Sequence, residues 1–86
     1  MLSLNALNFI KETENFKQKI ADQNLEVDFC LEIRIRLLPN PKDQYYYYQV
    51  YFDFGLPGNS KKDILARVKI NENGTFELLE LEYVTA

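Results

Sequence analysis

The chain has no histidine among its 86 residues, and Cys30 is its only cysteine. Histidine activates the nucleophile in Ser-His-Asp and Cys-His sites and is the commonest metal ligand, so its absence argues against both kinds of site. One cysteine is too few for a structural zinc site within one chain. It also precludes an intrachain disulfide, so we expect a reducing, cytoplasmic location.

The sequence also lacks a long apolar run and an excess of positive charge. Asn5 and Asn8 interrupt the apolar N-terminal segment, and no basic residues precede it, so we expect neither a signal peptide nor a membrane span. The net charge of −3 provides no general attraction to phosphates, which makes nucleic acid an unfavoured partner. No cofactor, metal or small-molecule ligand is indicated.

The composition is that of one globular domain covering residues 1–86. Hydrophobic residues make up 47% of the chain and charged residues 27%, which is typical of a folded protein. A domain of this length buries a small fraction of its surface, and self-association would bury more.

Apolar spacing predicts one amphipathic helix over residues 3–23. Ser3 is the expected N-cap and Asn24 the expected stop. The apolar residues that recur at spacings of three, four or seven are Leu2, Ala6, Phe9, Phe16 and Ile20.

Strict alternation of apolar and polar residues predicts a half-buried strand over 26–38. Turn residues at 40–43 separate it from a tyrosine-rich second strand. A third strand follows the loop at 55–63, and a hairpin turn precedes the fourth. The expected bounds of the later elements are 44–54 and 64–70 for strands two and three, 71–74 for the hairpin turn, and about 76–84 for strand four.

The hydrophobic pattern indicates which side chains face the core. Pairing Ile33 with Val50 makes every inner pair of the first hairpin apolar or aromatic, whereas a slip of one residue buries polar groups without partners. In this register Phe29 pairs with Phe54, and Phe54 then pairs with Ile64. The fourth strand changes parity, so we expect a bulge near 78–79.

Together these elements predict an α+β fold, with one N-terminal helix packed on a four-stranded antiparallel meander sheet. The αββββ order resembles the cystatin-type arrangement, in which a sheet grips one helix. The resemblance is one of topology and implies no residue roles, because no motif of that family is present.

The sheet face away from the helix is expected to carry tyrosines and arginines, both of which are enriched in interface hot spots. Acids at one end (Glu26, Asp28, Asp53) and bases toward the other (Arg34, Arg36, Lys69) would complement a second copy turned by half a turn. The predicted contact residues are Glu32, Arg34, Arg36, Tyr45, Tyr47, Tyr51 and Arg67.

Several interpretations of this face remain open. The leading one is a non-catalytic protein-binding module of inhibitor, immunity or adaptor type that forms a homodimer. The same face could instead be merely solvated, or could bind single-stranded nucleic acid by stacking bases on tyrosines and holding phosphates with basic side chains. The binders would then be Tyr45, Tyr47, Arg34, Arg36, Arg67 and Lys69. A small enzyme using carboxylates such as Glu77, Glu80 and Glu82 is a further alternative, although a charged edge that discourages aggregation explains these residues.

Three weaker signals have structural explanations. Cys30 is expected on the outer face opposite Asp53, as an unreactive thiol. Residues 69–80 match part of a calcium-loop pattern but read as a hairpin, because strands flank them. The glycines and lysines of 55–62 lack the spacing of a phosphate loop and read as an ordinary connection.

Overall fold

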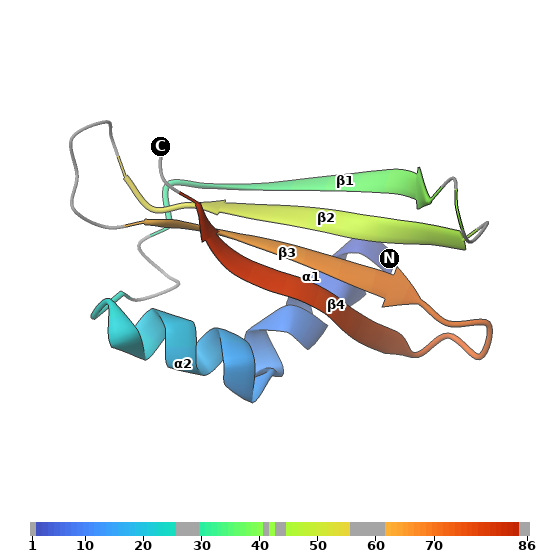
Figure 1. Cartoon of the computed structure of the whole chain (residues 1–86), viewed down its shortest axis with the longest axis horizontal. Coiled ribbons are helices and arrows are strands. Elements are labelled where there is room, and N and C mark those ends of the chain that lie inside the picture. The colour runs from blue at the N-terminus through green and yellow to red at the C-terminus, as the bar shows by residue number, and fades with distance from the viewer. Residues whose placement is uncertain (1, 26–29, 41, 43–44, 56–61, 85–86) are drawn as a thin grey trace.

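The computed structural model describes residues 2–25, 30–40, 42, 45–55 and 62–84 (Figure 1). It confirms the α+β class and the antiparallel meander, with strand order β1-β2-β3-β4. The elements are α1 (Leu2–Glu12), α2 (Glu14–Asp22), β1 (Glu32–Asn40), β2 (Tyr45–Asp53), β3 (Asp63–Ile70) and β4 (Phe76–Val84).

The expected single helix is in fact two helices that meet at Thr13. This residue is extended, with φ −70° and ψ 142°, and caps α2 by accepting a hydrogen bond from the Phe16 N–H at 3.2 Å. Its hydroxyl also donates to the Ile10 carbonyl oxygen at 2.7 Å. Because α1 begins at Leu2, Ser3 lies inside the helix and is not the N-cap. The threonine therefore ends one helix and begins the next.

The predicted stop at Asn24 is confirmed. Its φ of 54° lies in the left-handed region, which asparagine tolerates better than most residues. The Asn24 N–H donates to the Ala21 carbonyl oxygen at 3.1 Å, and the Leu25 N–H donates to that of Ile20 at 2.9 Å. These two bonds form a Schellman motif that satisfies the last carbonyls of α2.

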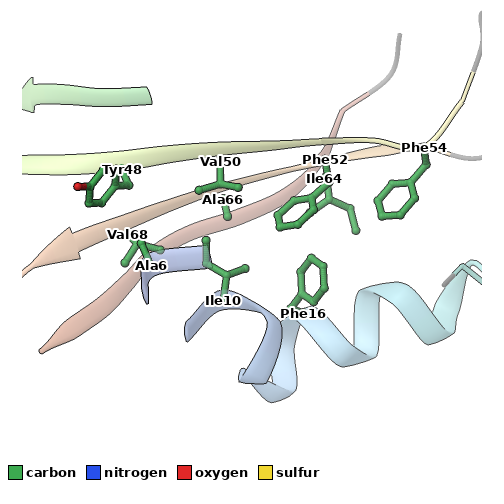
Figure 2. Packing of buried hydrophobic residues seen from close by; sticks show 10 residues of the cluster. All are labelled: Ala6, Ile10, Phe16, Tyr48, Val50, Phe52, Phe54, Ile64, Ala66 and Val68. Atoms are coloured by element: carbon green, nitrogen blue, oxygen red, sulfur yellow. The ribbon is translucent and has the colours of Figure 1, made fainter. Parts of the chain in front are cut away.

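The core lies between the helices and one face of the sheet (Figure 2). Phe52 is fully buried and its ring centroid is 4.8 Å from that of Phe16 on α2. The predicted parity of β2 is confirmed, because Tyr47 and Tyr51 alternate with the buried positions. The buried apolar residues are Ala6, Ile10, Phe16, Tyr48, Val50, Phe52, Phe54, Ile64, Ala66 and Val68.

The predicted register is wrong by two residues. Ile33 pairs with Phe52 instead of Val50, and Ile64 pairs with Phe52 instead of Phe54. A shift of two leaves each side chain on its expected face, because strands have a period of two. The expected pair of Phe29 with Phe54 lies outside the described residues.

The bulge expected on the fourth strand is confirmed. Val68 pairs with Leu78 and Arg67 pairs with Glu80, so Leu79 is the extra residue. Leu79 is 39% exposed, whereas Leu78 packs against the core. The bulge thus restores the parity of β4.

The hairpin turn at 71–74 is confirmed. The Asn71 N–H donates to the Thr75 carbonyl oxygen at 2.8 Å, and Gly74 has a φ of +86°. Strands β3 and β4 flank the turn, as expected for a hairpin and not for a helix–loop–helix calcium site.

The helices cover only part of the sheet. α1 packs against β2, β3 and β4, and in Figure 1 the helical layer follows the β4 side while β1 forms the far edge. A helix is about 10 Å wide and strands are about 4.8 Å apart, so one helical layer covers roughly two strands. The helix-side face is consequently left open at the C-terminal end of β1, with Leu37 51% and Tyr46 59% exposed. Ile33 and Ile35, earlier in the strand, pack against the core.

Candidate functional site

The outer face, meaning the sheet face turned away from both helices, brings the predicted contact residues together. The sheet register places them in rows that run across the strands. Arg36 lies opposite Gln49 instead of the expected Tyr47, and Tyr51 lies opposite Leu65 instead of Arg67. The two central rows are Arg36–Gln49–Arg67–Glu80 and Arg34–Tyr51–Leu65–Glu82.

Arg34 is held in place by two neighbours. Its guanidinium carbon lies 4.7 Å from the centroid of the Tyr51 ring, and its Nη1 is 3.3 Å from a Glu32 carboxylate oxygen. Such exposed contacts add little stability, but they join the three side chains in one arrangement. Glu32, Arg34 and Tyr51 therefore form one ordered cluster at the β1 edge.

The two cationic side chains of β3 on the outer face, Arg67 and Lys69, also contact neighbouring side chains. Arg67 forms an ion pair with Glu80 on β4, and the Lys69 ammonium lies 4.7 Å from the centroid of the Tyr45 ring. The charge of Arg67 is thus matched within the chain. Of the predicted contact residues, Arg67 is less available to a partner than the sequence suggests.

The Tyr51 hydroxyl is bound to a carboxylate that the sequence analysis assigned to a loop. It donates to Oδ2 of Asp63 at 2.5 Å, while Oδ1 of Asp63 accepts from the Phe54 N–H at 3.0 Å. The hydrogen bond to Asp63, together with burial, raises the pKa of Tyr51 to about 12. Asp63 is buried and closes the β2–β3 connection, so its role is structural.

Among the described residues, the predicted contact residues Arg36, Tyr45 and Tyr47 keep free polar groups. Within the described part of the chain, Arg36 has no ionic partner and the Tyr47 hydroxyl has no hydrogen-bond partner. Tyr47 also borders a shallow depression of about 290 Å³ beside the exposed Leu79. The depression is lined by Asn40, Tyr47, Arg67, Leu79 and Glu80.

Charge on the outer face is separated across the strands. Arg34 and Arg36 lie on β1, whereas β4 carries Glu77, Glu80 and Glu82. The expected separation along the strands cannot be followed, because Glu26 and Asp28 lie outside the described residues. The outer face is therefore basic at one edge strand and acidic at the other.

The alternation predicted that Cys30 lies on the outer face, and this prediction is wrong. Cys30 is half-buried and packs against the core, with Sγ 3.2 Å from the carbonyl oxygens of Glu32 and Asp53. Burial raises the pKa of its thiol, which favours the unreactive protonated form.

The described residues contain neither a cluster of metal ligands nor a helix that could span a membrane. No group of three or more cysteine, aspartate or glutamate side chains among them could hold a metal ion. None of the helices in this part of the chain is long and apolar enough to cross a membrane.

No protein-family model, no curated protein and no solved structure matches this chain.

Proposed function

We propose that this chain is a non-catalytic protein-binding domain of inhibitor, immunity or adaptor type, acting in the cytoplasm as a homodimer through its outer face. The observation that carries the proposal is that, within the described residues, Tyr47 and Arg36 keep free polar groups on a sheet face that neither helix covers. Tyr and Arg combine apolar area with polar tips, and they dominate binding energy at many protein interfaces.

Charge separation supports a second copy as the partner. Rotation by half a turn about an axis parallel to the strands lays the outer face of one copy on that of another, with β1 over β4. Arg34 and Arg36 of each copy then face Glu80 and Glu82 of its partner. Among the described residues, Arg36 and Glu82 have no ion pair within their own chain, whereas Arg34 and Glu80 would share their charge with Glu32 and Arg67. Such self-complementarity is what a twofold interface requires.

The same charges weigh against the nucleic-acid alternative. A strand of nucleic acid stacked on Tyr45 and Tyr47 would pass close to the carboxylates of β4, which repel phosphates. The ion pair of Arg67 with Glu80 removes one cation from phosphate binding. We therefore favour a protein partner.

Tyr46 and Tyr47 provide a matched pair of variants, because these adjacent tyrosines lie on opposite faces of β2. Tyr47→Glu places a charge on the outer face, whereas Tyr46→Glu places the same charge on the opposite face at a side chain already 59% exposed. Sedimentation velocity over a concentration series measures the dimer of each. We expect Tyr47→Glu to weaken dimerisation by about tenfold or more, and Tyr46→Glu to leave it unchanged.

Two results would contradict the proposal. Equal dimerisation of wild type and Tyr47→Glu would show that the outer face is not the interface. The second result is a wild type that remains monomeric and binds a random single-stranded oligonucleotide tightly and in a salt-dependent way. This result would favour the nucleic-acid alternative.

A further inference from the structure

The two edge strands carry complementary side chains on both faces of the sheet. β1 alternates isoleucine and leucine on the helix side with Arg34 and Arg36 on the outer face. Beyond its bulge, β4 alternates Leu81 and Tyr83 on the helix side with Glu80 and Glu82 on the outer face. Each strand therefore has the apolar pattern of the other, and two arginines of β1 are matched by two glutamates of β4, although β1 also carries Glu32 on its outer face.

Pairing two copies through the same edge strand can bring like charges together. Pairing β1 with a second β1 centred on Ile35 places Arg34 opposite Arg36, and pairing two β4 strands brings their glutamates together. Like charges directly opposite each other destabilise a sheet. In the register centred on Ile35, a free β1 edge is thus better matched to a β4 edge than to another β1. A register centred on Ile33 would instead place Arg34 opposite Glu32, so it is the open face at Leu37 that favours β4 as the partner edge.

The placement of the helices provides a second complementarity. The helix-side face is open at the C-terminal end of β1, where Leu37 is 51% exposed. Next to β4, by contrast, α2 and the strand enclose a groove of about 430 Å³. Its lining combines polar α2 residues with apolar β4 residues: Asn15, Gln18, Lys19, Asp22, Leu78, Leu79, Glu80 and Leu81.

From these features we propose that β1 of one copy pairs, antiparallel, with β4 of a second copy. Extending the rows of the outer face places Arg36 of one copy opposite Glu80 of the next, and Arg34 opposite Glu82. On the helix side Ile35 then lies opposite Leu81. Leu37 lies beside Leu78, at the α2–β4 groove, so α2 of the next copy covers Leu37.

Features that discourage edge pairing lie at one end of the contact. Pro39 has no N–H to offer a neighbouring strand, and the bulge at Leu79 interrupts β4. In the proposed register both lie toward the same end of the contact, near the β3–β4 turn. The charged pairs occupy the other end, where β1 and β4 are regular.

This contact joins two different surfaces, so it is distinct from the face-to-face dimer proposed above. A head-to-tail contact closes into a ring or continues as a filament, according to the rotation between copies. The inference does not depend on the outer-face dimer, and each contact can exist without the other.

Charge exchange between the edges tests the pairing. Arg34→Glu/Arg36→Glu and Glu80→Arg/Glu82→Arg each place like charges across the contact, and each should weaken head-to-tail association by about tenfold or more. An equimolar mixture restores opposite charges at every contact and should assemble as wild type does. Lys17→Glu/Lys42→Glu and Glu14→Arg/Glu72→Arg make the same charge changes elsewhere and serve as matched controls. Circular dichroism verifies that all variants fold.

All these proteins are compared by sedimentation in a Tyr47→Glu background, which removes the outer-face dimer. Association that persists there and is lost on Leu37→Glu supports the edge contact even if the outer-face proposal fails. Complete loss of association with Tyr47→Glu alone overturns the edge contact and leaves the outer-face proposal intact. A mixture of the two charge-reversed variants that remains dissociated also overturns the edge contact.

Discussion

Neighbouring side chains on the outer face differ in how far the chain itself engages them. Tyr51 gives its hydroxyl to Asp63 and its ring to Arg34, whereas Tyr47, two rows away along β2, has no hydrogen-bond partner among the described residues. Two tyrosines of the same strand and face thus have different roles. Tyr51 stabilises the β2–β3 connection, and Tyr47 is available to a partner.

The Tyr51–Asp63 bond predicts a specific pH dependence. Tyr51 should titrate near pH 12 instead of 10. A group whose pKa is raised by folding contributes fully to stability below pH 10 and loses that contribution as the pH rises toward about 12. NMR titration of the tyrosine ring signals measures the pKa directly.

Asp63→Asn provides the comparison for this titration. Without the carboxylate, the pKa of Tyr51 should return toward 10, because the carboxylate is the main cause of the shift. An unchanged Tyr51 pKa in Asp63→Asn would show that the bond to Asp63 does not control it.

At the residue scale, the sequence predicted the sheet face of most side chains but not their hydrogen-bond partners. The alternation in β1 and β2 correctly placed Arg34 and Tyr47 on the outer face. It could not reveal the bond between Tyr51 and Asp63, because Asp63 follows a loop whose path no periodicity defines. Cys30 was misplaced for a similar reason, since it lies before the regular part of β1.

At the scale of elements, Thr13 determines the shape of the helical layer. Its hydroxyl accepts from the Phe16 N–H, which a helix break would otherwise leave unpaired. It also donates to the Ile10 carbonyl oxygen, which accepts from the Thr13 N–H as well. The break lets α1 place Ile10 and α2 place Phe16 on the same core. The apolar spacing continues across Thr13, which is why it predicted one helix.

Loss of this cap should destabilise the fold measurably. Thr13→Ala is expected to lower the free energy of unfolding by about 1 kcal/mol, within the usual range for N-caps. Thr13→Ser retains a hydroxyl and should cost less. Urea denaturation of the three proteins measures the difference, and equal stability of wild type and Thr13→Ala would contradict the capping role.

The register of the strands shows a second limit of sequence reasoning. Period-two patterning excludes a slip of one residue, because such a slip would bury Gln49 and Asp53. It does not distinguish registers that differ by two, since the same side chains still meet on the same face. The bulge at Leu79 was predictable because there the parity itself changes.

For the whole molecule, the decisive feature is that the helical layer is narrower than the sheet. Helix periodicity shows which side of a helix is apolar, but not which strands it will cover. The structure places the helices toward β4, which leaves the helix-side face open at the C-terminal end of β1 and creates the α2–β4 groove. Neither the open helix-side face nor the α2–β4 groove could therefore be predicted from the sequence.

The proposed dimer depends most on a contact of the Tyr47 ring with a second copy. Isotope-filtered NMR on a mixture of labelled and unlabelled protein detects protons of one copy that lie within about 5 Å of the other. We expect such signals between the Tyr47 ring and outer-face residues of the partner, including Leu79. Intermolecular signals confined to helix-side residues such as Leu37, with none from Tyr47, would contradict the account.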